Sequence, residues 1–248
     1  MSARERANHW SRSFLNAERI PFKFNDTILN MTTRDLSKLK FIQFALDAAV
    51  LRFGTFKTKA GRQSPYFFNA GLFTDGASVD QLGTFYSEAI LGSGVEFDML
   101  FGPAYKGITL AASTAIAMSR VGRNIPFAFN RKEAKDHGEG GTIVGAPLQG
   151  KVLIIDDVIS AGTSIRESVD IIRAYGAQPC GVAVSLDRQE KGVGELSAIQ
   201  EIEKEFDLPV ISIFTLDDLI EFLSNRGDLR EELNQIQGYR KKYGSKSG

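Results

Sequence analysis

The chain has 248 residues, of which 43% are hydrophobic and 24% charged, as in one large globular domain or two small ones. Its 30 basic and 30 acidic residues give a formal net charge of zero, without the basic excess of a general nucleic-acid binder or a protein of anionic membranes. The single cysteine, Cys180, excludes an internal disulfide and favours a reducing, cytoplasmic location, and no run reaches the ~20 apolar residues that span a bilayer.

Residues 1–30 differ from the rest of the chain, because their charges are scattered without a helical or strand period. Their arginines and serines faintly resemble a transit peptide, but Glu5 and Glu18 are unusual in one. We therefore expect residues 1–30 to be a disordered or dispensable extension, or a start-site artefact. A short docking segment and a targeting peptide are the alternatives. The main domain is expected over residues 31–248.

From Leu36 onward the sequence predicts alternating helices and strands. Helices are expected over 36–50, 78–92, 107–121, 164–175, 194–206, 216–224 and 228–242, and strands over 97–101, 126–130, 152–155, 180–186 and 209–214. A strand–turn–strand unit is expected over 53–71, and a loop over the polar, glycine-rich residues 131–142. The alternation predicts a parallel sheet covered on both faces, with ligands beyond the carboxyl ends of its strands.

The most informative segment is VLIIDDVISAGTS, residues 152–164. An apolar strand ends in two carboxylates, Asp156 and Asp157, and the hydroxylated turn 160–164 opens a helix. The N–H groups at a helix N-terminus bind a phosphate, whereas carboxylates suit ribose hydroxyls or a magnesium ion held through water. A phosphate beside a vicinal diol is a ribose 5-phosphate, so this segment predicts a ribose 5-phosphate site.

Two other interpretations of this segment are open. An Asp-Asp pair can simply end a strand before a capped helix. It can also be the acidic motif of a P-loop nucleotide-binding protein, but that requires a lysine after the second glycine of the phosphate loop. In the nearest match, residues 102–107, Lys106 precedes that glycine, which argues against a P-loop.

The same segment resembles the phosphoribosyl pyrophosphate signature of type I phosphoribosyltransferases. Four further segments narrow the resemblance to the orotate phosphoribosyltransferase family: GRQSPYFFNAGLF (61–73), LFGPAYKGI (100–108), FNRKEAKDHGEGG (129–141) and SLDRQE (185–190). The resemblance covers roughly residues 36–243. One departure is Ser160, where threonine is common in the family, and serine keeps the hydroxyl.

The resemblance implies a fold and a reaction. The fold is α/β, with a mainly parallel sheet flanked by helices, a small N-terminal hood subdomain and a flexible lid loop. The reaction transfers ribose 5-phosphate from phosphoribosyl pyrophosphate to orotate in pyrimidine (UMP) biosynthesis. The implied cofactor is Mg²⁺, bound mainly through phosphoribosyl pyrophosphate and water without a dedicated protein cage. The implied assembly is a homodimer whose lid is shared between subunits.

The resemblance also implies the site residues. The catalytic residues would be Lys135, Asp156 and Asp157, with Lys135 aiding pyrophosphate departure electrostatically or as an acid. Phosphoribosyl pyrophosphate would be bound by Lys59, Tyr105, Lys106, Arg131, Lys132, Lys135, His137, Asp156, Asp157, Val158, Ile159, Ser160, Ala161, Gly162, Thr163 and Ser164. Orotate would be bound by Phe67, Phe68, Ser160 and Arg188, the last through its carboxylate.

Each feature also has an ordinary structural interpretation. A polar loop is usually solvated, a strand-end arginine is usually a surface charge, and consecutive aromatic residues usually pack in a core, one on each face of the strand. Two rival functions are a regulator that senses phosphoribosyl pyrophosphate without catalysis and a transferase for another base. The zero net charge argues against the first, and the Phe-Phe-Asn and Asp-Arg-Gln segments argue against the second.

Overall fold

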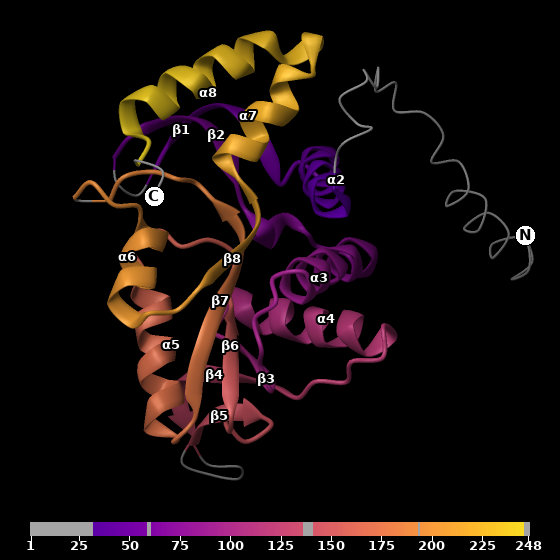
Figure 1. The fold of residues 1–248 in the computed structure, drawn as a ribbon, viewed down its shortest axis with the longest axis vertical. Coiled ribbons are helices and arrows are strands. Elements are labelled where there is room, and N and C mark those ends of the chain that lie inside the picture. The colour runs from indigo at the N-terminus through magenta and orange to yellow at the C-terminus, as the bar shows by residue number, and fades with distance from the viewer. Residues whose placement is uncertain (1–31, 59–60, 136–140, 193, 246–248) are drawn as a thin grey trace, which may run out of the picture. The chain divides into compact units, whose positions relative to one another are not determined.

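The computed structural model describes residues 32–58, 61–135, 141–192 and 194–245, and Figure 1 shows their arrangement. The chain divides into two units, residues 1–33 and 34–248, and the fold below is that of the second. The extension predicted over residues 1–30 lies outside the described residues and stays a prediction.

A six-stranded sheet forms the centre of the fold, with the strand order β5-β4-β3-β6-β7-β8. Every neighbouring pair is parallel except β4 and β5, so the predicted, mainly parallel α/β architecture is confirmed. The strands are β3 (Met99–Gly102), β4 (Phe127–Lys135), β5 (Gly141–Gly145), β6 (Lys151–Ile155), β7 (Gln178–Asp187) and β8 (Val210–Thr215).

One edge of this sheet corrects a sequence prediction. Residues 131–142 were expected to be a loop, but β4 continues to Lys135 and β5 begins at Gly141. The two strands pair in antiparallel fashion from Ala128 opposite Gly145 to Lys135 opposite Gly141, with an irregularity between. Polar residues are tolerated there because β3 ends opposite Phe129, so among the described strands the rest of β4 pairs only with the edge strand β5.

Helices cover both faces of the sheet (Figure 1). On one side lie α3 (Gly76–Leu91) and α4 (Lys106–Arg120), and on the other lie α5 (Thr163–Ala174) and α6 (Ala198–Phe206). The buried side chains of β6 and β7 pack against Ile165, Val169 and Ile172 of α5. On the first side α3 and α4 pack closely, since a Cβ atom on Gly83 would lie 2.5 Å from the backbone oxygen of Ser113.

The hood consists of a two-stranded ribbon and the helices beside it. Strands β1 (Leu51–Lys57) and β2 (Gln63–Phe68) pair in antiparallel fashion, as predicted. The short helix η2 (Ala70–Leu72) follows, and α2 (Thr33–Asp47), α7 (Leu216–Ser224), η3 (Gly227–Leu229) and α8 (Arg230–Tyr243) complete this part. Figure 1 shows the C-terminal α8 lying along the ribbon, so the hood contains both early and late parts of the chain.

A cluster of aromatic rings joins the hood to the sheet. The ring of Phe41 on α2 lies 6.4 Å from Phe68 on β2, 5.1 Å from Phe85 on α3 and 5.5 Å from Phe214 on β8, measured between ring centroids. Such contacts fix the ribbon over the carboxyl end of the sheet. Among the helices of the described residues, none has the length and apolar character needed to cross a membrane.

Candidate active site

The carboxyl end of β6 places the paired carboxylates between two other strands. Residues 152–155 are fully buried, with β3 on one side and β7 on the other. The backbone ladder continues past the strand, because the Asp156 N–H donates to the Ala183 oxygen (3.0 Å) and the Ser185 N–H donates to the Asp157 oxygen (2.9 Å). Both acids are therefore held by regular backbone hydrogen bonds, as predicted for a strand end.

The two carboxylates have different surroundings. Asp157 is buried and forms an ion pair with Lys106, whose Nζ lies 2.5 Å from Oδ2. Asp156 is half-buried, and its Oδ1 accepts a hydrogen bond from the Asp157 N–H at 2.9 Å. Burial and the neighbouring charge of Asp157 raise the pKa of Asp156 to about 6, against the opposing effects of that N–H, Ser164 and Lys106. Above that pH, Asp156 is an anionic acceptor suited to ribose hydroxyls.

Tyr86, which the sequence analysis did not identify, anchors this strand end. It is buried on α3, and its hydroxyl donates to the backbone oxygen of Asp156 and lies within hydrogen-bond distance of the Ser185 hydroxyl, at 2.7 Å in each case. Burial raises the pKa of Tyr86 well above its usual value, so it stays protonated. Tyr86 therefore holds the ends of β6 and β7 together.

The turn after the carboxylates leads into the N-terminus of α5. Gly162 precedes this helix with φ +73°, and a Cβ atom there would lie 2.8 Å from Nη1 of Arg166 and 2.9 Å from Cδ1 of Ile202. Both the dihedral angle and the close approach therefore favour glycine. Ser160, Ala161 and Thr163 are exposed and Ser164 is half-buried, so the turn presents hydroxyls and the free N–H groups of a helix start.

Two of the residues predicted to bind phosphoribosyl pyrophosphate have apolar side chains. The backbone of Val158 forms a parallel bridge with Leu186 on β7, and the side chain of Ile159 is buried in the core beside α5. Apolar side chains cannot hydrogen-bond a phosphate, so these two residues can contribute only backbone groups to such a site.

The turn after β3 brings Tyr105 and Lys106 to the same end of the sheet. Gly102 and Gly107 approach so closely that a Cβ atom on Gly102 would lie 2.0 Å from the Gly107 oxygen. The Ala104–Tyr105 peptide bond is cis, and the Ala104 N–H donates to Oδ1 of Asn130 at 2.7 Å. Asn130, also not identified from the sequence, thereby ties this turn to β4.

A cation from β4 completes this cluster. Tyr105 is 69% exposed, and Nζ of Lys132 lies 5.2 Å from the centroid of its ring. Arg131 is half-buried on the same strand. The structure thus brings both Lys106 and Lys132 to this turn, where they can face a polyanion.

The predicted orotate residues lie in the hood and beside it. Arg188 follows β7, and its Nε and Nη2 atoms donate to Oε1 of Glu190 while Nη2 also donates to Ser64. The two aromatic residues of β2 point to opposite faces. Phe67 stacks on Phe56 at 5.3 Å, whereas Phe68 is buried on the face that carries Ser64. Of the two, Phe68 therefore shares the face of β2 that Arg188 contacts.

Three predicted residues are described in part or not at all. Lys59 and His137 lie outside the described residues. Lys135 ends β4, but its side chain is not described. The described residues contain no group of three or more His, Cys, Asp or Glu side chains that could hold a metal ion by themselves.

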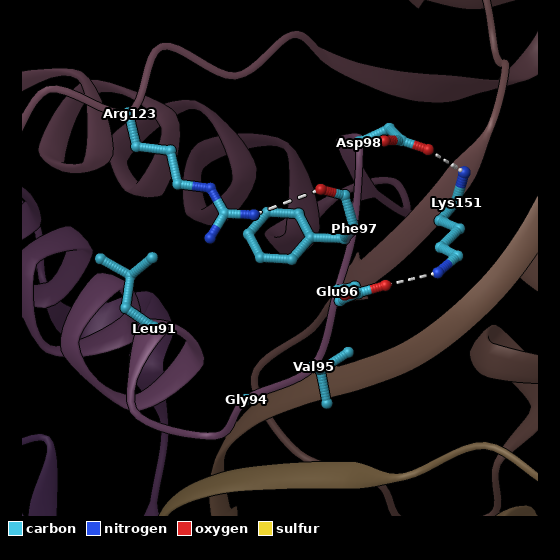
Figure 2. Close-up of a pocket in the computed structure, with 8 residues that line it drawn as sticks. All are labelled: Leu91, Gly94, Val95, Glu96, Phe97, Asp98, Arg123 and Lys151. Atoms are coloured by element: carbon cyan, nitrogen blue, oxygen red, sulfur yellow. Dashed lines mark hydrogen bonds and ion pairs between the residues drawn. The ribbon is translucent and has the colours of Figure 1, made fainter.

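A separate pocket of about 360 Å³ lies at the opposite end of the sheet. Figure 2 shows Lys151 between Glu96 and Asp98, with its Nζ 2.8 Å from Glu96 and its N–H donating to Asp98 at 2.7 Å. Arg123 lies over the ring of Phe97 at 4.2 Å. Residues 96–98 and 151 precede or begin β3 and β6, so this pocket is at the amino ends of the strands, away from Asp156 and Asp157.

Comparison with known proteins agrees with this geometry. The family model of the phosphoribosyl transferase domain matches residues 73–209, which include the paired carboxylates and the turn into α5. The chain belongs to the phosphoribosyltransferase family, and the predicted fold class is confirmed.

More similar proteins show which branch of this family the chain belongs to. The orotate phosphoribosyltransferase of Thiobacillus denitrificans is 62% identical over 207 residues, which cover 84% of this chain and 98% of that protein. That of Chromobacterium violaceum is 65% identical over 204 residues, covering 82% and 95%. The crystal structure of the Francisella tularensis orotate phosphoribosyltransferase matches with a TM-score of 0.76 and 42% identity, over 83% of this chain and all of that one. Within the family, the chain belongs to the orotate phosphoribosyltransferases.

Proposed function

We propose that this chain transfers ribose 5-phosphate from phosphoribosyl pyrophosphate to orotate, in pyrimidine (UMP) biosynthesis. The bond between ribose C1 and the diphosphate oxygen breaks, and a bond between C1 and a ring nitrogen of orotate forms. The products are orotidine 5′-phosphate and pyrophosphate. Positive charge develops on the ribose and negative charge on the leaving diphosphate, so the site must stabilise both.

The observation that carries the proposal is the carboxylate pair beside the start of α5. The 5′-phosphate would be bound by the N–H groups and hydroxyls of residues 160–164, while Asp156 and Asp157 accept from the ribose hydroxyls. Binding the 5′-phosphate requires an anion site, and binding the ribose hydroxyls requires hydrogen-bond acceptors directly beside it. The backbone from β6 to α5 provides both within nine residues, 156–164.

Magnesium fits the donors at this end of the sheet. Asp156 offers a half-buried carboxylate, and oxygen ligands with retained water are what Mg²⁺ prefers. Asp156 and Asp157 would hold the ion through water, with the diphosphate oxygens as direct ligands. When bound, the ion would neutralise charge on the departing diphosphate.

The cations around Tyr105 would bind the diphosphate. The positions of Lys106 and Lys132 beside Tyr105 support this proposal, and Arg131 lies on β4 next to Lys132. The resemblance to the family adds Lys59, His137 and Lys135, the last as the residue that aids departure, electrostatically or as an acid. Residues 131–142 would act as a lid that excludes water during transfer.

Orotate would be bound between the hood and the sheet. Arg188 is placed to pair with its carboxylate, and Phe68, Phe67 and Ser160 are the remaining candidates. A carboxylate partner for Arg188 would select orotate over uracil or a purine base.

We also propose that the protein is a cytoplasmic homodimer whose lid serves the neighbouring subunit. The family resemblance supports the assembly, and the single cysteine supports a reducing location.

The test is an optical assay of orotate consumption with and without phosphoribosyl pyrophosphate and magnesium. Turnover should require all three components. Asp156→Asn combined with Asp157→Asn should lower kcat/KM by about 100- to 1000-fold or more, while circular dichroism shows an intact fold. Near-normal turnover in the double variant would contradict the ribose-site assignment.

A further inference from the structure

The segment that carries Arg188 is held from two sides. On one side, Arg188 donates from Nε (2.8 Å) and Nη2 (2.6 Å) to the same oxygen of Glu190, and its guanidinium lies 4.3 Å from the ring centroid of Tyr66. On the other side, Gln189 exchanges hydrogen bonds with Asp217 at the start of α7. Gln189 is therefore anchored through its side chain, while Arg188 is held by the Glu190 carboxylate, the Ser64 hydroxyl and the ring of Tyr66.

The C-terminal end of α8 lies against this segment as well. The Lys191 N–H donates to the Tyr243 oxygen (2.9 Å), and the Ser245 N–H donates to the Gln189 oxygen (2.8 Å). Between them, Glu190 and Gly244 form an antiparallel bridge. These bonds hold α8 in place next to the Arg188–Glu190 pair.

Tyr239 on α8 has a buried hydroxyl without a hydrogen-bond partner among the described residues. The residue is only 6% exposed, and its ring packs edge-on against Tyr66 at 6.4 Å. Burial comes first in raising the pKa of Tyr239, followed by Glu190 through its charge and as a nearby acceptor, and Arg188 lowers this pKa; the hydroxyl therefore lies close to both groups, without a hydrogen bond of normal geometry, and stays protonated. Buried hydroxyls are rarely left unpaired, and an exception calls for an explanation.

We propose that Tyr239 is a positioning residue for Arg188. When the guanidinium of Arg188 turns from Glu190 to bind the orotate carboxylate, the Tyr239 hydroxyl donates a hydrogen bond to Glu190 in its place. The proposal rests on the proposed role of Arg188. An incoming carboxylate needs the planar fork of the guanidinium, and the fork atoms Nε and Nη2 are the two that Glu190 now occupies. Once they turn to the substrate, Glu190 is left as a carboxylate that is only 14% exposed.

A buried carboxylate without donors is costly, so the exchange requires replacements. Tyr66 is one, with its hydroxyl 3.5 Å from the same oxygen of Glu190, and Arg62 keeps a cation 4.0 Å from the other oxygen. Both distances are long. Among the described residues, Tyr239 offers a further donor beside the pair, and a bond to Glu190 would give its buried hydroxyl a partner.

The test compares Tyr239→Phe with Tyr243→Phe in the full chain. Tyr243 lies on the same helix with its ring 4.9 Å from Tyr239, which makes it a matched control. Tyr239→Phe should raise the KM and the calorimetric Kd for orotate roughly 10- to 100-fold, the usual effect of one hydrogen bond to a charged group. The KM for phosphoribosyl pyrophosphate and the melting temperature of the free protein should stay unchanged. Tyr243→Phe should change none of these quantities.

An unchanged orotate KM in Tyr239→Phe would overturn the inference, and so would an equal rise for both substrates or a drop in the melting temperature of the free protein. Arg188→Ala separates this failure from that of the proposed function. If Arg188→Ala weakens orotate binding and Tyr239→Phe does not, the role proposed for Tyr239 fails while that of Arg188 stands. If Arg188→Ala leaves orotate binding intact, the proposed role of Arg188 fails and the inference falls with it.

Discussion

Asp156→Asn should stabilise the folded protein at neutral and alkaline pH, although it removes a site residue. In the folded protein the pKa of Asp156 is about 6, against 3.8 for the free side chain, because of burial and the charge of Asp157. Between these two values the folded state holds a proton that the unfolded state has released. Stability therefore falls as pH rises through this range and is lowest above about pH 6.

The size of the effect follows from that difference. Each pKa unit corresponds to about 1.4 kcal/mol, so the ionised carboxylate of Asp156 lowers the free energy of unfolding by up to about 3 kcal/mol at pH 8 and about half of that at pH 5. Asparagine has the same shape, keeps an oxygen to accept the Asp157 N–H and carries no charge. It should recover most of this free energy at pH 8 and less at pH 5.

Urea unfolding at pH 5 and pH 8 measures this difference, with Asp157→Asn as the control. Asp157 is buried beside Lys106 at 2.5 Å, so its substitution removes an ion pair and should not stabilise. The reasoning would be refuted if Asp156→Asn left stability unchanged or lowered it at pH 8, or if its effect were the same at both pH values.

The remaining predictions concern substrate selection and assembly. Arg188→Ala should weaken orotate binding by about 2–4 kcal/mol and phosphoribosyl pyrophosphate binding much less, because one charge-assisted pair with the carboxylate is lost; equal losses in titration calorimetry would contradict that role. Mixing Lys135→Ala subunits with Asp156→Asn subunits should restore about a quarter of wild-type activity, since about half of the dimers are then mixed and each has one intact site. No recovery after verified subunit exchange would reject a shared lid.

The backbone of the candidate site could be predicted because its sequence signal is local. The apolar run 152–155 ends at two acids, and the small residues 160–164 follow directly, so strand, turn and helix start are all encoded within one short segment. The glycines act locally too, since φ at Gly162 is positive and Gly102 meets Gly107 only five residues later.

The residues that were missed act across long sequence distances. Tyr86 reaches an oxygen 70 residues away, and its helical, apolar surroundings give no sign of that contact. Lys106 was predicted as a binding residue, but its ion pair with Asp157, 51 residues away, could not be predicted. Strand β5 was missed because its glycine-flanked residues resemble a loop until pairing with β4 is known.

The pairing between residues 243–245 and the segment after Arg188 matters for anyone who handles the protein. An affinity tag or a deletion at the carboxyl end acts next to the backbone bonds that hold Gln189 and Lys191. Loss of these bonds would not be detected from yield or purity, because the central sheet and its core lie away from them. A carboxyl-terminal fusion is therefore best accepted only after its orotate affinity has been matched to that of the untagged chain.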